Sequence, residues 1–337
     1  MLGDLGGAFS VPMVRIGDRL GLYAALKEHG PMNSAELSAK AGVAERYARE
    51  WLSHQAASGY LDYDAATDTF ALSPEQAMVF VEPGSPVYLQ GAFDLAVAMI
   101  ENQAKVEPAF RTGEGVGWGD QTPCLFCTTG RFFRPAYQNN LVSSWLPALD
   151  GVVEKLESGA SVADIGCGHG FSTIFMAKAF PNSTFVGYDF HPSSIEQARV
   201  HAKQHGVAAN TMFEVALARE YPGHDFDLVT FFDCLHDMGD PIGAARHVRE
   251  TLKPDGTWMV VEPAAGDRLV DNINPVGRLC YAASTLICVP TSLDQPVGAA
   301  FGAQAGFAKL SSAIKEGGFT HVRKAIETPF NMVLEAR

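Results

Sequence analysis

The feature that most constrains this sequence is a short glycine-rich loop that follows an apolar run. Residues 162–165 are mostly apolar, and the amphipathic segment 171–180 follows the loop. Three glycines alternate with other residues between them, namely Gly166, Gly168 and Gly170. Glycine is used where the backbone adopts positive φ or a ligand comes close. The pattern predicts a strand, a tight loop and a helix whose N-terminal N–H groups attract a carboxylate or phosphate.

A second acidic residue lies where a ribose-binding carboxylate is expected. Residues 184–189 have the composition of another strand and end in Asp189, nineteen residues after Gly170. A carboxylate at this place in a βαβ unit can accept hydrogen bonds from ribose hydroxyls. The G-x-G-x-G spacing, with Asp164 two residues before the first glycine, differs from the G-x-G-x-x-G of dinucleotide sites. The spacing therefore favours a different nucleoside-containing ligand.

Together the two segments resemble motifs I and II of the class I S-adenosylmethionine-dependent methyltransferases. The resemblance implies S-adenosyl-L-methionine as cofactor and S-adenosyl-L-homocysteine as product. It implies that the loop holds the methionine end and Asp189 the ribose. The residues that it places beside the cofactor are Asp164, Gly166, Cys167, Gly168, Gly170, Asp189, Phe190 and Asp233.

Length and charge narrow the class of protein further. A chain of 337 residues is long enough for two domains. With 25 Lys+Arg and 38 Asp+Glu its net charge is −13, which disfavours a polyanionic partner such as nucleic acid. We find no signal-peptide pattern, no apolar run of the ~18 residues that a spanning helix needs, and no disulfide framework among the six cysteines. We expect a cytoplasmic protein without membrane contact.

Residues 1–80 have the pattern of a winged-helix domain. Apolar periodicity predicts a helix over 9–27, and the stretch 32–37 offers an N-cap for a short helix that ends at Gly42. A third helix is expected over 44–58, followed by a small hairpin formed by 59–63 and 69–72.

The charge of this domain indicates whether its winged helix binds DNA or mediates dimerisation. Residues 1–80 contain six Lys+Arg against ten Asp+Glu, whereas a DNA-binding domain usually carries net positive charge. In the small-molecule O-methyltransferases that the chain resembles, the same module serves dimerisation and closes the neighbouring site. We therefore expect a homodimer through residues 1–80, with DNA binding as the alternative.

Residues 81–150 are predicted to link the two domains through helices over 87–104 and 134–149. The glycine-rich stretch 113–120 between these helices is expected to be either a lid or a flexible surface loop. Cys124 and Cys127 form a single C-x-x-C pair. One pair without a second is a poor zinc site, so packed thiols are favoured and no metal is expected.

Residues 151–337 are predicted to be an α/β domain. Further strands are expected over 211–215, 226–233 and 257–262, and they alternate with helices over 193–206 and 242–252. A final hairpin-like pair, 319–328 and 330–336, matches the sixth and seventh strands of the methyltransferase fold that the chain resembles. The predicted fold is therefore a Rossmann-like, seven-stranded class I methyltransferase domain behind a mostly helical winged-helix domain. The apolar helix 274–289 is expected to cover the acceptor.

The stretch from Asp233 to Asp240 follows the central predicted strand and could carry the chemistry. It is similar to the histidine–aspartate–tryptophan stretch of plant-type O-methyltransferases, with Met238 in place of the tryptophan. The resemblance implies that His236 is the general base and that Glu262 flanks it. A base is needed because a phenol, with a pKa near 10, is neutral at pH 7. A histidine that only packs or caps a helix is the alternative.

The sequence departs from the family that it resembles at one place. The stretch 215–218 has no acid, although many family members place an adenine-binding acid there.

Other methyltransferase classes are less compatible with the sequence. The stretch 232–235 is neither the Asp/Asn-Pro-Pro-aromatic stretch of amino-methylating nucleic-acid enzymes nor the Pro-Cys of cytosine C5 enzymes.

The whole chain most resembles winged-helix methyltransferases of a bacterial, mycobacterial type. The function that this implies is methyl transfer to a small, partly apolar acceptor, at oxygen. Two alternatives stay open from the sequence: a cofactor-sensing DNA-binding regulator, and an enzyme of this fold that catalyses another reaction.

Overall fold

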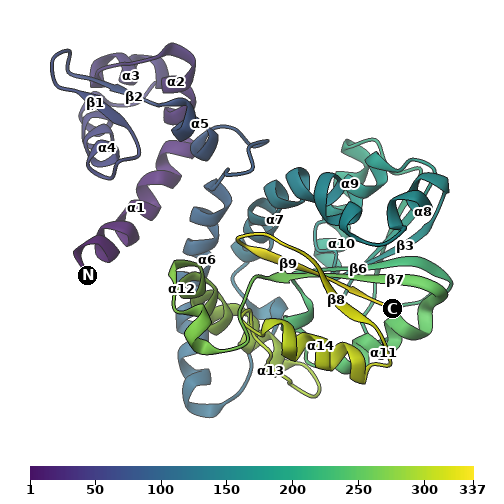
Figure 1. Ribbon diagram of the computed structural model, residues 1–337. Coiled ribbons are helices and arrows are strands. Elements are labelled where there is room, and N and C mark those ends of the chain that lie inside the picture. The colour runs from purple at the N-terminus through teal and green to yellow at the C-terminus, as the bar shows by residue number, and fades with distance from the viewer. The chain divides into compact units, whose positions relative to one another are not determined.

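The computed structural model describes residues 1–337, apart from the side chain of Cys124. The chain divides into two compact units. One comprises residues 1–98 and 128–139, and the other comprises residues 99–127 and 140–337. Helices α6 (Gln90–Thr112) and α7 (Cys124–Ala136) each pass from one unit to the other (Figure 1).

The first unit is a helical bundle with a small β-hairpin. Its elements are α1 (Leu2–Arg19), α2 (Leu22–His29), α3 (Ser34–Ala41), α4 (Glu45–Ala57), β1 (Asp62–Asp64), β2 (Thr69–Ala71) and α5 (Pro74–Phe80). The N-cap predicted within 32–37 is confirmed, and the structure shows that it is Asn33, which forms a capping box with Glu36 at the start of α3. The prediction of a single helix over 9–27 is wrong, because Gly21 adopts φ 68° between α1 and α2. A residue in the left-handed region cannot continue a right-handed helix.

The linking region contains longer helices than the sequence predicted. The predicted helix 87–104 is α6, which extends to Thr112, and the predicted helix 134–149 begins earlier, as α7 at Cys124. The loop between them contains one short turn, η1 (Trp118–Asp120). Pro135 lies near the end of α7, and the π-helical stretch η2 (Tyr137–Trp145) and the turn η3 (Leu146–Ala148) follow it. Proline lacks an N–H, so it disrupts the regular hydrogen-bond ladder of a helix.

The second unit is built on a seven-stranded sheet with the order β5-β4-β3-β6-β7-β9-β8 in the described part of the chain. Its strands are β3 (Ser161–Ile165), β4 (Thr184–Asp189), β5 (Thr211–Val215), β6 (Phe226–Phe232), β7 (Leu252–Pro263), β8 (Val322–Glu327) and β9 (Asn331–Ala336). The first five are parallel, and β9 is antiparallel to both β7 and β8. The chain order reverses between β3 and β6, and ligands bind at such a switch point.

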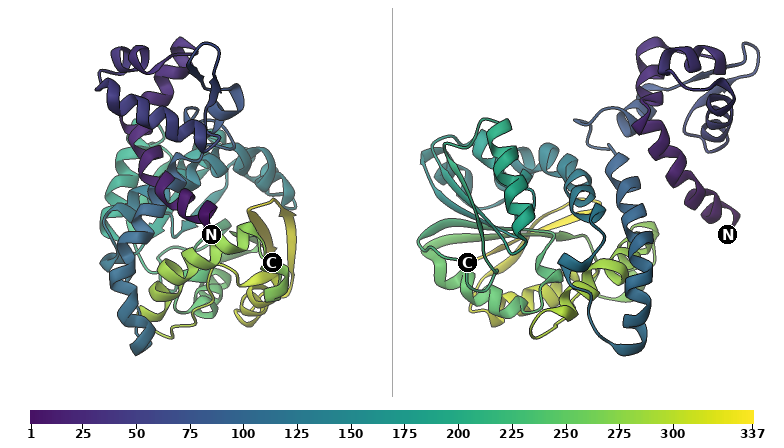
Figure 2. Two further views of the ribbon diagram at one scale, coloured as in Figure 1. Left: turned by 90° about the vertical axis from the view of Figure 1, so that its left-hand side faces the viewer. Right: turned by 180° about the vertical axis from the view of Figure 1, so that it is seen from behind.

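Helices cover both faces of this sheet, as in a Rossmann-like fold. Figure 1 places α8 (Val152–Ser158), α9 (Phe171–Ala179) and α10 (Pro192–Gln204) on one face, and α11 (Pro241–Thr251) and α14 (Gly306–Glu316) on the other. Figure 2 shows the same layers from behind. Strand β7 begins before the predicted 257–262, since Leu252 already pairs with Phe226 across an irregularity in the register. The fold class is as predicted.

An additional helical layer follows the parallel strands. It consists of η5 (Leu269–Asn272), α12 (Pro275–Ala283), the π-helical stretch η6 (Ser284–Cys288) and α13 (Val289–Asp294). Contrary to the sequence expectation, the stretch Pro275–Asp294 is long and apolar enough to span a membrane by length and composition. Ser292 Oγ of this stretch donates to the carbonyl oxygen of Met238 at 2.8 Å, so its C-terminal part packs on the loop that follows β6.

Candidate active site

The glycine loop has the backbone conformation that the sequence predicted. Gly166, Gly168 and Gly170 have φ values of 72°, 52° and 78°. A Cβ on Gly166 would lie 2.8 Å from Cys234 Sγ, and one on Gly170 would lie 2.8 Å from the Phe213 ring. No atom would lie within 4 Å of a Cβ on Gly168. The loop is thus packed on two sides and open at Gly168, where a ligand can approach the backbone.

Asp164 lies beneath this loop and is fully buried. Its Oδ2 accepts hydrogen bonds from Ser172 Oγ and Thr173 Oγ1, both at 2.6 Å, and its Oδ1 accepts one from Thr230 Oγ1 at 3.0 Å. Burial raises the pKa of this carboxyl to about 6, against the opposing effect of the three hydroxyls. Asp164 joins β3, β6 and the first turn of α9. In this structure its carboxylate binds protein groups, and it sets the shape of the loop.

Asp189 lies at the carboxyl end of β4 and contacts the loop directly. Its Oδ2 accepts a hydrogen bond from the Gly168 N–H at 2.9 Å, and its Oδ1 accepts one from the His191 N–H at 2.9 Å. Burial raises the pKa of this carboxyl. A carboxylate has about four lone-pair sites, so both oxygens retain acceptor capacity for ribose hydroxyls. The side chain of Phe190 is 42% exposed, so an apolar ring lies at the surface beside this carboxylate.

Cys167 and Cys234 support the loop from inside. Cys167 is buried, and a Cβ on the neighbouring Gly187 would lie 2.9 Å from its Sγ. Burial raises the pKa of both thiols, so neither is a thiolate at neutral pH. The backbone of Cys167 is also engaged, because its N–H donates to the carbonyl oxygen of Tyr188 at 3.0 Å and its carbonyl oxygen accepts a hydrogen bond from the Gly170 N–H at 2.8 Å. Cys167 therefore shapes the loop through both its side chain and its backbone.

Asp233 follows β6 in a strained backbone conformation, with φ 49°. Its Oδ1 accepts a hydrogen bond from Asn331 Nδ2 at 3.0 Å, and its N–H donates to the carbonyl oxygen of Val261. Non-glycine residues with positive φ are uncommon and occur frequently at functional sites. Asn331 begins β9, about a hundred residues later, and no residue pattern in the sequence predicted its contact with Asp233.

His236 lies in the turn η4 (Leu235–Asp237) just after β6, and Glu262 lies near the carboxyl end of the neighbouring strand β7. His236 Nδ1 lies 2.5 Å from Glu262 Oε2, while Glu262 Oε1 accepts a hydrogen bond from the Leu235 N–H at 2.9 Å. His236 Nε2 lies 3.0 Å from Asp237 Oδ1. The exposed fraction is 3% for His236 and 0% for Glu262. The imidazole is therefore held between two carboxylates, and its orientation is fixed by Glu262.

The electrostatics of His236 are dominated by these carboxylates. Burial alone lowers the pKa of a histidine, but Asp237 and Glu262 outweigh it and raise the pKa of His236 well above 6.5. In this state the imidazole is protonated at neutral pH.

Cys288, from η6, completes the cluster around Nε2. Ligand atoms of His236, Asp237 and Cys288 lie within 4.8 Å of one another, a set that could hold a divalent metal ion. The contact between Nε2 and Asp237 accounts for these groups without a metal, and we assign none. Burial raises the pKa of Cys288 to about 12, so it is a neutral thiol. The sequence predicted that this helix covers the acceptor but did not identify Cys288.

The predicted lid, residues 113–120, packs within the second unit together with the residues that follow it. The Val116 N–H donates to the carbonyl oxygen of Pro290 at 3.0 Å. Cys127 is exposed, so the prediction of a packed thiol is wrong there, and the side chain of Cys124 lies outside the described residues.

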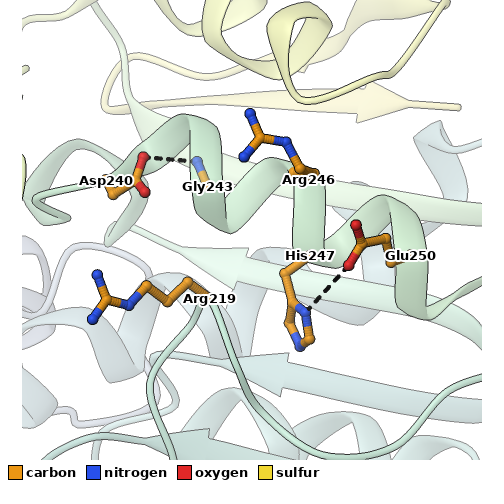
Figure 3. Close-up of a pocket in the computed structure, with 6 residues that line it drawn as sticks. All are labelled: Arg219, Asp240, Gly243, Arg246, His247 and Glu250. Atoms are coloured by element: carbon orange, nitrogen blue, oxygen red, sulfur yellow. Dashed lines mark hydrogen bonds and ion pairs between the residues drawn. The ribbon is translucent and has the colours of Figure 1, made fainter.

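A surface pocket flanks α11 (Figure 3). It is lined by Arg219, Asp240, Gly243, Arg246, His247 and Glu250. Asp240 caps α11 by accepting a hydrogen bond from the Gly243 N–H at 2.8 Å. In Figure 3 the guanidinium groups of Arg219 and Arg246 lie well apart, on different sides of the helix. The charges do not converge, and we assign this pocket no role.

Two family matches identify the domains that carry this geometry. Residues 156–292 match the family described as "Methyltransferase domain", and residues 8–81 match the "Rv2258c-like winged HTH domain". The chain is a winged-helix protein with a methyltransferase domain. The glycine loop, Asp189, His236 and Glu262 all lie within the matched methyltransferase domain.

Similar proteins agree with this assignment. The Ubiquinone biosynthesis O-methyltransferase of Actinobacillus pleuropneumoniae serotype 5b (strain L20) is 31% identical over 115 residues, which are 32% of this chain and 48% of that protein. This chain therefore spans about half the length of that relative. The methyltransferase-domain protein also shares its fold with two solved structures along nearly its whole length. PigF with SAH has a TM-score of 0.77 at 15% identity, over 99% of this chain and 97% of that one. Human N-acetylserotonin methyltransferase with SAM has a TM-score of 0.73 at 17% identity, over 99% and 95%.

The loop region fits S-adenosylmethionine on its own geometry. The open backbone at Gly168 and the acceptor capacity of Asp189 are the two features that such a ligand needs, for its amino-acid part and its ribose. The stretch 215–218 is where the sequence has no adenine-binding acid. Two of its residues, Val215 and Leu217, are exposed and apolar.

Proposed function

We propose that this methyltransferase-domain protein transfers a methyl group from S-adenosylmethionine to a hydroxyl oxygen of a small, partly apolar molecule. The observation that supports it most is the buried pair of His236 and Glu262, at the carboxyl ends of adjacent strands in the matched methyltransferase domain. A buried imidazole oriented by a carboxylate is suited to accept a proton from a hydroxyl group.

The cofactor supplies a methyl group already activated on a sulfonium sulfur, and the product thioether is neutral. The methionine end of the cofactor would lie against Gly166, Gly168 and Gly170. Asp189 would bind its ribose, and Phe190 would contact an apolar face of its nucleoside. Asp164 shapes the loop from below through its three hydroxyl partners. Asp233, whose strained backbone is fixed by Asn331, would lie on the cofactor side of the loop that carries His236. The protein's own contribution is alignment, exclusion of water and removal of a proton.

His236 must be neutral to act as a base, and the cluster offers a way to achieve this. Asp237 is partly exposed, with 21% of its side chain accessible, whereas Glu262 is buried. An acceptor hydroxyl that replaces Asp237 at Nε2 removes one of the two carboxylates that raise the pKa of His236. With that carboxylate displaced, His236 loses its Nε2 proton to solvent and becomes a neutral base. The proton of the hydroxyl then passes to Nε2 as the acceptor oxygen bonds to the methyl carbon and the carbon–sulfur bond breaks, and Glu262 stabilises the resulting imidazolium.

The surroundings of His236 support an acceptor with apolar character. Cys288 and Ile287 are buried in η6, and burial raises the pKa of the Cys280 and Cys288 thiols, so both are neutral. No Lys or Arg among the described residues forms an ion pair with Asp237 or Glu262. A small aromatic hydroxyl compound fits such surroundings better than a strongly anionic one.

The test is methyl transfer from radiolabelled S-adenosylmethionine to matched aryl acceptors that differ only in carrying a hydroxyl, an amino or a thiol group. We expect label on the hydroxyl compounds, and at least a hundredfold loss in His236→Asn with cofactor binding retained. Label only on the amino or thiol compounds contradicts methylation at oxygen. Full activity of His236→Asn at saturating acceptor contradicts the base assignment.

We also propose that the winged-helix domain makes the protein a homodimer and that the protein acts in the cytoplasm. The N-terminal helix α1 supports a second copy, because Leu2, Leu5 and Phe9 are 87%, 54% and 69% exposed. An apolar helix face of this kind is typical of a protein interface. Sedimentation should give a dimer for the natural chain and a monomer for the double variant Leu5→Glu, Phe9→Glu. Met212→Glu, at an exposed site on β5, is the control and should stay dimeric.

A further inference from the structure

The segment between α6 and α7, together with the first turn of α7, contacts His191 next to Asp189 on one side and helix α13 next to the His236 loop on the other. It lies outside residues 156–292, so the match to a methyltransferase domain assigns it no role. Residues 113–127 nevertheless belong to the same compact unit as the glycine loop and His236.

On the nucleoside side, the contact is made by Phe126. Its ring stacks on the imidazole of His191, with the ring centres 4.3 Å apart and an angle of 28° between the planes. The N–H of His191 donates to Oδ1 of Asp189, the proposed ribose ligand, and His191 Nδ1 lies 2.9 Å from Ser194 Oγ. Trp118 packs edge-on against Phe126 at 5.5 Å. An aromatic stack thus ends next to the carboxylate that would bind the ribose.

On the acceptor side, the contact is made by a buried polar network. Gln121 Nε2 donates to Thr291 Oγ1 at 3.0 Å, and Gln121 Oε1 accepts a hydrogen bond from Asn102 Nδ2. All three residues are buried, with at most 3% of each exposed. Both Nε2 and Oε1 of Gln121 therefore have a hydrogen-bond partner within the protein, as buried polar groups usually do.

Helix α13, which carries Thr291, is in turn bound to the His236 loop. Ser292 Oγ donates to the carbonyl oxygen of Met238 at 2.8 Å, and Gln295 Nε2 donates to that of Asp237 at 3.0 Å. Gln295 Oε1 accepts a hydrogen bond from the Gly239 N–H at 3.1 Å. A continuous set of contacts therefore leads from Asp189 through Phe126 and Gln121 to the residues that flank His236.

We propose that residues 115–126 form a strap that closes the adenine side of the cofactor site through Phe126 and transmits cofactor binding to α13 through Gln121. The proposal rests on the proposed function, since it takes S-adenosylmethionine as the ligand. An aromatic wall at Phe126 and His191 supplies adenine recognition by stacking, which is independent of an acid after β5. Once the cofactor is bound, the strap and α13 are ordered together, so the acceptor site forms after the cofactor site.

The first test measures the binding of S-adenosylhomocysteine by calorimetry. Phe126→Ala should weaken binding at least tenfold, and Phe126→Leu, which keeps an apolar side chain, at least fivefold. Phe126→Tyr should stay within threefold of the natural chain. Phe110→Ala is the control, because Phe110 is 74% exposed on α6, and it should have no effect. Unchanged binding in both Phe126→Ala and Phe126→Leu overturns the role of Phe126.

The second test measures amide hydrogen exchange over residues 285–296 and 235–239, with and without S-adenosylhomocysteine. In the natural chain the ligand should slow exchange in both segments. Thr291→Val removes the hydroxyl that binds Gln121 and keeps a side chain of similar shape. It should leave the affinity within threefold but abolish the slowing over 285–296. Slowing that persists in Thr291→Val overturns the link through Gln121.

The two tests also separate this inference from the proposed function. If the natural chain does not bind S-adenosylhomocysteine at all, the proposed function fails with it. If the natural chain binds and the Phe126 variants bind equally well, only the strap fails.

Discussion

His236 Nδ1 lies 2.5 Å from Glu262 Oε2, across the ends of two parallel strands that are neighbours in the sheet. The two residues are 26 positions apart in the chain, and the pairing of β6 with β7 brings them together. Asp237 approaches the opposite ring nitrogen at 3.0 Å. Both carboxylates raise the pKa of His236, and the protonation state of this imidazole is the property of the site most open to measurement.

Asp237→Asn should lower the pKa of His236. The amide is neutral, so one of the two carboxylates that raise this pKa is lost while Glu262 stays in place. The raised pKa means that the charged imidazolium contributes stability below pH 6.5, and this contribution is lost as the pH rises through the pKa of the folded state. Proton–carbon correlation spectra of labelled histidine, recorded from pH 6 to 10, give the pKa directly.

The matched control for this titration is Asp225→Asn. Asp225 is exposed and pairs with His224, so its loss should leave the titration of His236 unchanged. A His236 that titrates at or below pH 6.5 in the natural chain contradicts the proposed electrostatics, as does an unchanged pKa in Asp237→Asn.

Asp164→Asn should change the pH dependence of stability. The pKa of Asp164 is raised to about 6, so the folded state binds the proton more tightly than the unfolded state. The free energy of unfolding of the natural chain should therefore fall as the pH rises through this range. Relative to Asp164→Asn, we expect a fall of about 1 kcal/mol between pH 5 and pH 7.5. Urea unfolding of both proteins at the two pH values measures it. A relative rise would contradict the burial argument.

Gly166→Ala should weaken S-adenosylhomocysteine binding at least tenfold. The new methyl group would lie 2.8 Å from Cys234 Sγ, and the backbone has φ 72°. Strain and crowding together should cost about 2 kcal/mol of stability. Gly42→Ala is the control, since Gly42 has a similar φ of 67° with open space around it. It should lose about 1 kcal/mol through backbone strain alone and bind the ligand normally. Equal binding by both variants would show that the loop does not hold the cofactor.

Removal of metal ions should leave the protein active. We assign His236, Asp237 and Cys288 to a cluster without a metal ion, so dialysis against a strong chelator should change neither ligand affinity nor methyl transfer. Cys288→Ser should retain both within threefold. Activity that the chelator abolishes and zinc restores would instead show that these residues bind a metal.

Much of the fold was predictable because the residue patterns of the individual segments agree with the overall architecture. The three glycines, the acid at the end of β4 and the alternation of strands with helices specify the parallel part of the sheet. The break at Gly21 was missed because the apolar pattern continues through it, and only the backbone angle ends the helix. The sequence could place His236 and Glu262 at strand ends, and the register of the sheet then brings them together.

Other parts of the site could not be predicted, for a physical reason. Asn331 reaches Asp233 from an antiparallel strand at the end of the chain, and no local periodicity encodes that contact. Gln121 and Phe126 lie just after the stretch 113–120 that was predicted to be either a lid or a loop, and their partners are 170 and 65 residues away. Such contacts depend on long-range packing, so residue patterns within one segment do not reveal them.

The measurement that tests the account most directly is calorimetric titration of S-adenosylhomocysteine into the natural chain and into Asp189→Ala. We predict one binding site per chain with micromolar affinity, and at least a thirtyfold loss in Asp189→Ala, because ribose hydroxyls would lose their acceptor and Gly168 its hydrogen-bond partner. Absence of binding to the natural chain at millimolar ligand, or equal binding by the variant, would contradict the cofactor site on which the proposed function depends.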